Sequence, residues 1–416
     1  MKLFKKLALF VIAIAISLGC TSPDSQKQPQ TESQAKEPTP PSGKELAQKY
    51  IIVDGHIDVP YRLRNNWEDI SDSTQSGDFD YPRAKEGGLD APFMSIYIPV
   101  RYQETGGAKA VADSLINMVQ GIANDHPKKF AIATSPEEIR QHVDEGLIAL
   151  PTGMENGAPI GTDLSNIRYF YDRGIRYITL AHSRDNKISD SSYDTTEDTH
   201  NGLSDFGREV VQEMNRVGMM VDVSHITDEA FFDVMEVTQA PVVATHSSVR
   251  HFTPGFERNM SDTLITRLAE NNGVIMINFG STFLDSTSNK SSTRVRTEIE
   301  EKIEERGLEP GSKEAQEFSE TYFEENFQYS TVEKAADHID YVVELVGIEH
   351  VGLGSDYDGV GNTLPTGLKD VSSYPNLFDE LLDRGYSEED VQKIASGNIF
   401  RVWEQVNKVA EGMQNQ

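Results

Sequence analysis

Short apolar runs rich in β-forming residues recur along this chain, and segments with helical periodicity separate them. This alternation predicts parallel βα units. Eight units is the number that closes a (β/α)8 TIM barrel, whereas an open doubly wound sheet is the alternative. The eight runs are Tyr50–Asp54, Phe93–Pro99, Ile148–Met154, Tyr177–Ala181, Met219–Ser224, Pro241–Thr245, Val274–Phe279 and His350–Ser355.

Helical segments are expected between and after these runs. Those between the runs are Ala108–Asn124, Leu164–Arg173, Asp205–Val217, Asp228–Val237, Asp262–Asn271 and Glu333–Val346. Ser204, Thr227 and Ser261 stand where N-caps are expected. Closing helices are predicted at Tyr374–Arg384, Ser387–Ala395 and Ile399–Ala410.

A polar, highly charged segment from about residue 284 to residue 331 interrupts the alternation after the seventh run. We expect an inserted helical hairpin there, over the barrel mouth or at a subunit contact. A solvated charged excursion is the alternative.

The N-terminus has the character of an export signal. Three lysines precede an apolar run from Leu7 to Leu18, which is too short to span a bilayer. We expect residues 1–19 to be a signal peptide and Cys20 to become an acylated first residue, with simple secretion as the alternative. Ser17 departs from the usual lipobox, which carries Leu at that position.

Residues 20–43 are polar and rich in proline, so we expect a disordered tether. It would hold a single catalytic domain, residues 44–416, on the lipid of a bacterial cell envelope, at the periplasmic or outer-membrane face. Cys20 is the only cysteine, which excludes internal disulfides and thiolate metal sites. The formal charge of -29 argues against a nucleic-acid partner.

Residues that suit a metal centre follow the predicted strands, at the rim that carries the active site in such barrels. His56 and Asp58 follow the first run in alternation, so their side chains point to the same side. Glu155 ends the third run, His225 the fifth and His246 the sixth. Imidazole and carboxylate ligands suit zinc, and a carboxylate shared by two ions would complete a two-metal site.

Three further polar residues fit roles beside these ligands: His182 after the fourth run, Arg258 after the sixth and Asp356 after the eighth. Asp358 lies so near that the residues alone do not choose between it and Asp356. Structural roles are expected for the remaining histidines, which are His126, His142, His200, His251, His338 and His350.

Eight segments occur in order between residues 50 and 405, namely DGHIDVP, GMENG, TLAHS, VDVSH, THSS, ERNMSD, VGLGSDYDGV and GNIFRV. With these segments in this order, the chain resembles the membrane dipeptidase (renal dipeptidase) family of zinc peptidases. The resemblance implies an amidohydrolase-like barrel, small dipeptide substrates, two Zn²⁺ per chain and a homodimer. It places one zinc on His56, Asp58 and Glu155, and the second on Glu155, His225 and His246.

The resemblance also implies roles for the residues beside the ligands. Asp356, rather than Asp358, would handle the proton, His182 would contact the scissile carbonyl or its oxyanion, and Arg258 would clamp the substrate's C-terminal carboxylate. Two metal ions would lower the pKa of a bridging water, so that hydroxide attacks the peptide carbonyl. A bidentate Arg258 would favour dipeptides over long peptides.

Phe283 departs from the family pattern, because mammalian relatives have a tyrosine there that helps to hold the substrate carboxylate. Thr282 and Ser281 are candidates to replace that donor. The substrate therefore stays open, including C-terminal D-residues and β-lactams. One alternative is a binuclear metal amidohydrolase acting on another small amide, such as an N-acyl amino acid or a β-lactam. A binding lipoprotein without catalysis is disfavoured, because every proposed ligand and Asp356 are present.

Overall fold

The computed structural model describes residues 40–196 and 199–415. The chain from Pro41 onward forms one compact unit. The predicted signal peptide, Cys20 and most of the predicted tether lie outside the described residues. Regular structure begins at the end of the predicted tether, where Ser42 caps helix α1 (Gly43–Lys49). Within the described part, no helix combines the length and apolar character needed to cross a bilayer.

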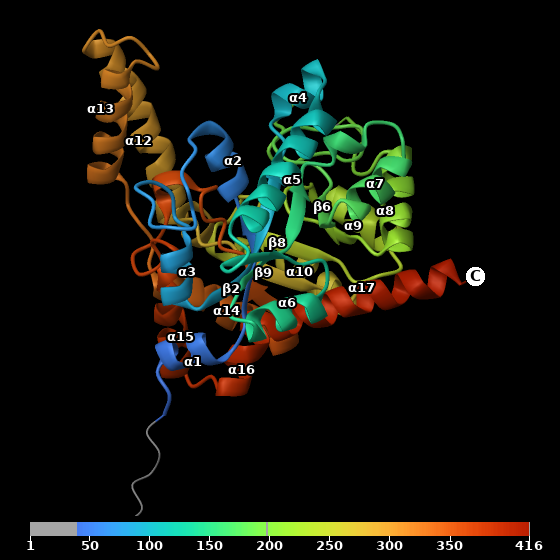
Figure 1. The fold of residues 1–416 in the computed structure, drawn as a ribbon. Coiled ribbons are helices and arrows are strands. Elements are labelled where there is room, and N and C mark those ends of the chain that lie inside the picture. The colour runs from blue at the N-terminus through green and yellow to red at the C-terminus, as the bar shows by residue number, and fades with distance from the viewer. Residues whose placement is uncertain (1–39, 197–198, 416) are drawn as a thin grey trace, which may run out of the picture. The chain divides into compact units, whose positions relative to one another are not determined.

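Eight parallel strands close into a barrel (Figure 1). Closure follows from β1, which pairs with both β2 and β10. The barrel strands are β1 (Ile52–Ile57), β2 (Leu89–Tyr97), β5 (Thr152–Glu155), β6 (Ile175–Thr179), β7 (Met220–Asp222), β8 (Val243–Ser247), β9 (Val274–Ile277) and β10 (Val351–Leu353). The predicted fold class is confirmed, and the open sheet is excluded.

The third predicted run is two strands rather than one. Its first half forms β4 (Ile148–Leu150), which pairs with β3 (Phe130–Ile132) in a separate two-stranded sheet, and its second half forms β5. Pro151 stands between the two halves, and a proline has no N–H with which to continue a ladder. The first predicted strand ends too early, because β1 reaches Ile57 and therefore contains His56.

Helices surround the strands, as parallel βα units require. They are α2 (Val59–Asn65), α3 (Tyr81–Gly87), α4 (Val100–Thr105), α5 (Ala108–Asp125), α6 (Pro136–Asp144), α7 (Ser165–Asp172), α8 (Asp205–Val217), α9 (Asp228–Val237), α10 (Asp262–Glu270), α14 (Val332–Val346), α15 (Tyr374–Asp383), α16 (Glu388–Gln392) and α17 (Asn398–Gln414). Ser204 and Thr227 cap α8 and α9 through their side chains. Ser261 occupies the N-cap of α10 without a side-chain bond.

The charged segment after β9 forms α11 (Ser281–Leu284), α12 (Ser286–Glu305) and α13 (Lys313–Asn326). Helices α12 and α13 lie side by side at the end of the barrel that also carries α2 (Figure 1). They share a small apolar cluster built from Val295, Ile299, Phe323 and Phe327. This cluster accounts for a stable hairpin in a segment that is otherwise strongly charged.

The opposite end of the barrel is closed by α17 (Figure 1). Trp403 of this helix is fully buried, and its ring centroid lies 5.4 Å from that of Phe93 in β2. Phe93 in turn lies 5.4 Å from the ring of Tyr177 in β6. A column of aromatic rings therefore runs from the closing helix through the barrel interior.

Replacing Trp403 by alanine should leave a large cavity beneath the barrel. We expect Trp403→Ala to lower the free energy of unfolding by about 3–5 kcal/mol, measured by urea denaturation followed by circular dichroism. The control is Trp67, whose side chain is 61% exposed. Trp67→Ala should change the free energy of unfolding by no more than about 0.5 kcal/mol. Equal effects of the two substitutions would contradict this account of the core.

Candidate metal centre

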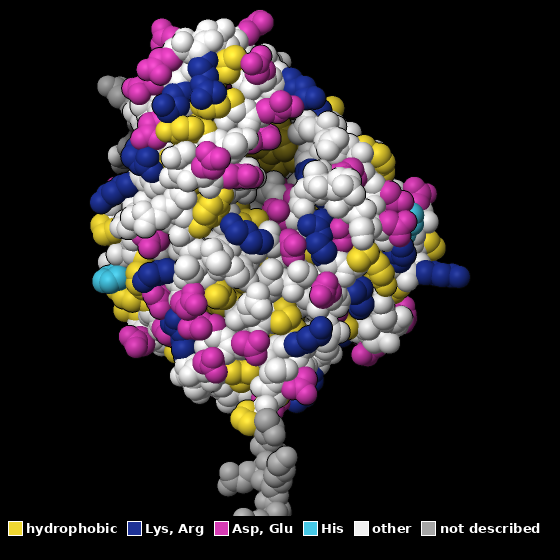
Figure 2. Space-filling view, turned by 90° about the vertical axis from the view of Figure 1, so that its left-hand side faces the viewer, with side chains coloured by type: hydrophobic (Ala, Val, Ile, Leu, Met, Phe, Trp, Pro, Cys, Tyr) yellow, Lys and Arg dark blue, Asp and Glu magenta, His cyan; other side chains and the backbone are white. Residues whose placement is uncertain are grey.

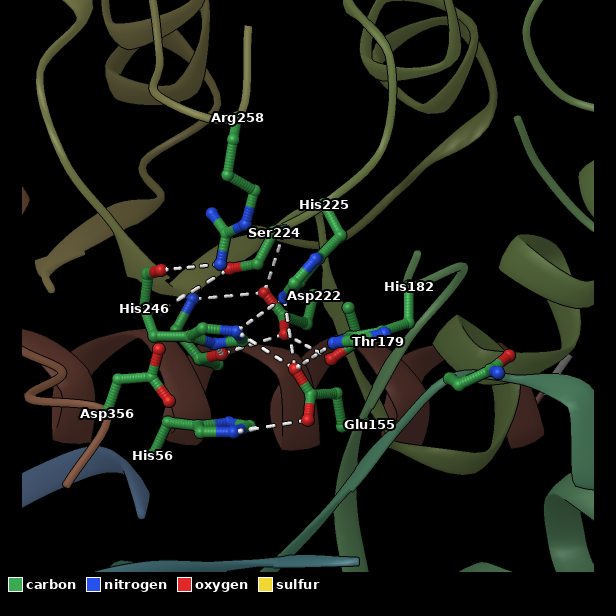
Figure 3. Close-up of polar contacts among 12 residues, drawn as sticks. His56, Glu155, Thr179, His182, Asp222, Ser224, His225, His246, Arg258 and Asp356 are labelled. Atoms are coloured by element: carbon green, nitrogen blue, oxygen red, sulfur yellow. Dashed lines mark hydrogen bonds and ion pairs between the residues drawn. The ribbon is translucent and has the colours of Figure 1, made fainter. Parts of the chain in front are cut away.

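Four of the five predicted metal ligands meet at one end of the barrel (Figure 3), namely His56, Glu155, His225 and His246, and the fifth, Asp58, contacts His56. His56 lies in β1, and Asp58 follows directly as the N-cap of α2. Glu155 is the last residue of β5, His246 lies in β8 and His225 follows β7 by three residues. All five side chains are buried.

Strand register places the centre at one level of the barrel. Tyr97 of β2 is paired with Glu155 of β5, which is paired with Thr179 of β6, which is paired with Asp222 of β7. The four residues form one row across neighbouring strands. Because side chains alternate between the two faces along each strand, residues paired in register direct their side chains to the same face.

Glu155 occupies the middle of the ligand set (Figure 3). Its Oε2 lies 3.5 Å from Nε2 of His56. Its Oε1 lies 3.0 Å from Nε2 of His225 and 3.1 Å from Nε2 of His246. Nε2 of His56 is also 3.5 Å from Oδ2 of Asp58. The two carboxylate oxygens of Glu155 thus face the two predicted ligand groups separately.

Buried partners orient two of the ligand histidines. Nδ1 of His56 lies 2.8 Å from the Tyr177 hydroxyl, and Nδ1 of His246 lies 2.8 Å from the Thr245 hydroxyl. Thr245 donates its own proton to Asp222, at 2.7 Å. The Thr245 oxygen therefore accepts from an Nδ1–H of His246, which leaves a lone pair on Nε2. Such contacts fix the tautomer of a metal-ligating histidine.

The donor set fits divalent cations. Among the described residues, Nε2 of His56 and Oδ1 of Asp58 are buried without a hydrogen-bond partner. Burial together with the nearby carboxylates of Asp58 and Glu155 raises the pKa of Asp356 well above its usual range. Buried carboxylates facing unpartnered imidazole nitrogens match what a cation of the zinc type requires.

Proximity groups seven residues of the described part into three overlapping sets, each able to offer ligand atoms to one ion. The sets are His56 with Glu155 and His246, Glu155 with His182 and His225, and His56 with Asp58 and Asp356. Glu155 belongs to two of them, in keeping with a shared carboxylate. His182 and Asp356 lie close enough to join the predicted ligands.

The backbone is unusual at two of these residues. His225 and Asp356 have φ angles of 72° and 63°, in the left-handed region that few non-glycine residues adopt. Hydrogen bonds hold both: the Ser192 amide donates to the carbonyl of His225, and the Asp356 amide donates to that of His56. Strain retained in this way is characteristic of functional sites.

The loop after β10 distinguishes Asp356 from Asp358. Asp356 Oδ2 accepts a bond of 2.8 Å from Asn278, and the carboxylate faces the ligand histidines (Figure 3). Asp358 instead receives the Nε–H of Arg62 at 3.0 Å. A side chain at Gly359 would collide with Asp356 and Asp58, since a Cβ there would lie 2.1 Å and 2.3 Å from their oxygens.

The remaining predicted site residues lie at the edge of the centre. Nε2 of His182 is 3.5 Å from Oε1 of Glu155. Arg258 is buried and donates to the Ser247 hydroxyl and to the carbonyl of His246, at 2.7 Å and 2.8 Å. Among the described residues, its guanidinium forms no ion pair, and its Nε–H has no acceptor. Arg258 can therefore receive a carboxylate.

A cavity of about 440 Å³ opens above the centre. Figure 2 shows a hollow on the face that it presents, with acidic side chains at its edge. Phe283 lines the cavity and covers the Arg258 guanidinium at 5.3 Å from its ring centroid. Thr282 also lines it, whereas Ser281 is fully buried and accepts the Ser330 amide. Of the two candidate donors, Thr282 is the accessible one.

Sequence reasoning missed the residues that support the centre: Tyr177, Asp222, Thr245 and Asn278. Asp222 gave a usable signal, because it is an acidic residue inside the apolar run of β7. It accepts the hydroxyls of Thr179 and Thr245 and the amide of Ser224. The others carried no comparable signal, since hydroxyl and amide side chains are common in strands and loops.

The other histidines belong to none of the ligand groups found among the described residues. Buried His338, for example, accepts the Val249 amide through Nδ1, and its Nε2 lies 3.0 Å from the carbonyl of Leu284. Nε2 of His200 contacts the carbonyl of Asn186. These contacts agree with the structural roles expected for them.

A model of the membrane dipeptidase family (Peptidase family M19) matches residues 42–416. An uncharacterized dipeptidase of Schizosaccharomyces pombe is 31% identical over 370 residues, which cover 85% of this chain and 80% of the yeast protein.

Two solved structures are also similar to this chain. The probable dipeptidase PvdM from Pseudomonas aeruginosa has a TM-score of 0.76 and 27% identity, covering 88% of this chain and 98% of that one. A metallo peptidase from Rhodobacter sphaeroides is liganded with a phosphinate mimic of the dipeptide L-Ala-D-Ala. Its TM-score is 0.70 and its identity 26%, and the match covers 86% of this chain and 99% of that one.

Removing the Thr245 hydroxyl should weaken metal binding without removing a ligand. We expect Thr245→Val to lower metal affinity by about 10–100-fold, because His246 loses the acceptor of its Nδ1 proton. Competition with a chromophoric chelator measures this affinity directly. Thr266→Val, on the exposed side of α10, should leave it unchanged. An unaltered affinity in Thr245→Val would remove this contact from the account of the site.

Proposed function

This chain belongs to the membrane dipeptidase family, Peptidase family M19, and on that premise we propose a dipeptidase that binds two zinc ions. The arrangement of Glu155 carries the proposal, with one oxygen toward His56 and the other toward His225 and His246. His56, Asp58 and Glu155 would hold one ion, and Glu155, His225 and His246 the other. When bound, the ions would supply Lewis acidity and an activated water near neutral pH.

The substrate class follows from the family and from the shape of the site. The Rhodobacter sphaeroides metallo peptidase carries a mimic of L-Ala-D-Ala, which favours dipeptides here and makes C-terminal D-residues worth including in any substrate panel. A cavity of about 440 Å³ suits a ligand of that size. N-acyl amino acids and β-lactams belong in the same panel, because they share the amide.

Arg258 would hold the substrate's C-terminal carboxylate. Its guanidinium is buried and forms no ion pair among the described residues, so a bound carboxylate would compensate its charge. Contacts to Ser247 and to the carbonyl of His246 fix its orientation beside a ligand histidine. An interior segment of a long peptide carries no such carboxylate, which explains a preference for dipeptides.

Asp356 would handle the proton, and His182 would contact the scissile carbonyl oxygen. Asn278 holds one oxygen of Asp356, which leaves the other free to accept a proton and to pass it to the leaving amine. Burial lowers the pKa of His182, which keeps its imidazole neutral. One ring nitrogen of the neutral form can still donate to developing negative charge.

We further propose that the protein is exported and lipid-anchored through Cys20 at a bacterial cell envelope. The support is the lysine-rich start and the apolar run that ends before this cysteine. Labelling of the full chain with a fatty-acid analogue should mark the wild type and spare Cys20→Ser. Equal labelling of both, or of neither, would contradict acylation at this residue. The homodimer implied by the resemblance stays a prediction.

Metal content and turnover should separate two kinds of site residue. Glu155→Ala and His225→Ala should lose bound zinc and dipeptide hydrolysis together. Asp356→Asn should keep near-wild-type zinc while kcat falls by roughly 10²–10⁴-fold, since only the proton acceptor is lost. Elemental analysis and amino-acid release from dipeptides provide the two readouts.

Removal of the metal gives the corresponding test on the wild type. Dialysis against a chelator should abolish hydrolysis, and added zinc should restore it. Full activity of metal-free protein would overturn the zinc proposal. A wild type as inert as Asp356→Asn toward every small amide would favour the binding lipoprotein instead.

A further inference from the structure

The inserted hairpin forms part of the wall of the catalytic cavity. Arg296 and Ser292 of α12 line this cavity together with Asp58 and Glu155 of the metal centre. Both α12 residues lie within the inserted segment, so the insertion reaches the site instead of projecting only into solvent. Of the cavity-lining side chains in the described part, Arg296 is the one that is permanently cationic.

Arg296 lacks a counter-ion in the described part of the chain. Its Nε–H donates to the Ser292 hydroxyl at 3.3 Å, and its guanidinium carbon lies 5.8 Å from the Phe323 ring centroid. The neighbouring Arg294 differs, because it pairs with Glu298 at 2.9 Å and donates to the carbonyl of Asn326. Helix α12 thus carries one arginine with a carboxylate partner, Arg294, and one at the cavity, Arg296, whose guanidinium forms no ion pair within the described residues.

A second hollow of about 510 Å³ adjoins the cavity, and both are lined by Arg296, Val360 and Thr363. Arg296 therefore stands where the catalytic cavity opens outward between the hairpin and the loop that follows β10. A substrate side chain directed away from the metal centre on this side would meet the guanidinium.

The position of Arg296 is separate from that of Arg258. Arg258 is buried beneath Phe283 beside His246, whereas Arg296 is exposed on α12. Asp358, which also lines the cavity, is paired with Arg62. Glu300 and Glu320 line the adjoining hollow with Arg296, but neither forms an ion pair with it within the described residues. A ligand that engages both arginines needs two carboxylates.

We propose that Arg296 makes this site selective for dipeptides that carry an acidic side chain, aspartate or glutamate, in addition to the C-terminal carboxylate. The inference rests on the proposed dipeptidase function. Guanidinium groups bind carboxylates through paired, charge-assisted hydrogen bonds. The contacts of Arg296 with the Ser292 hydroxyl and the Phe323 ring leave its guanidinium able to bind a carboxylate in this way.

The test compares matched dipeptides that differ only by acid and amide, Ala-Glu with Ala-Gln and Glu-Ala with Gln-Ala. For the zinc-loaded wild type we expect a higher kcat/KM for the acid in one of the two pairs, and the responding pair shows which substrate residue faces Arg296. In Arg296→Ala this acid-to-amide ratio should fall on the order of tenfold. Arg296→Lys should retain part of it, and Arg294→Ala should retain all of it.

Added salt gives a second readout. The wild-type ratio should decrease as ionic strength rises, because the guanidinium is exposed, and the ratio of Arg296→Ala should not respond. Hydrolysis of acid and amide at equal rates by the wild type, or an unchanged ratio in Arg296→Ala, would overturn the inference while leaving the dipeptidase intact. Absence of hydrolysis for all four dipeptides would instead overturn the proposed function.

Discussion

The buried carboxylate of Glu155 is the constraint around which this structure is organised. An ionised carboxylate in an apolar interior is unstable unless positive charge and hydrogen-bond donors compensate it. Here its two oxygens face histidines from three different strands or strand ends, and no lysine or arginine pairs with it within the described residues. The histidine nitrogens supply part of that compensation, and the metal ions proposed for this centre would supply the rest, so metal binding would contribute to the stability of the barrel rim.

The barrel supplies the rigidity that such a centre needs. Pairing of parallel strands sets the level of Glu155, Thr179 and Asp222 to within one residue, because a shift of one residue would turn each side chain to the other face. Tyr177 links the centre to the core, since its ring packs on Phe93 and its hydroxyl contacts His56. Ligand orientation is thereby coupled to the packing of the closing helix.

The rim is built from loops and an inserted hairpin, unlike the regular strands beneath it. Two site residues, His225 and Asp356, hold left-handed backbone that the loops maintain through hydrogen bonds. The hairpin of α12 and α13 adds a wall with its own apolar cluster. It extends the cavity without altering the strands, so substrate selection can change while the metal centre stays the same. This separation explains how one barrel supports different substrates.

The sequence by itself predicted eight barrel strands, the end of the barrel that carries the site and five candidate metal ligands. These follow from local patterns, namely apolar runs of strand length and polar residues directly after them. The family resemblance had already implied Asp356 rather than Asp358. Tertiary structure alone decided the split of the third run at Pro151 and the supporting contacts of Tyr177 and Thr245, and it supplied the geometric reason for that choice. It also brought Arg296 to the cavity. Each of these depends on distances between segments remote in the chain, which residue patterns do not contain.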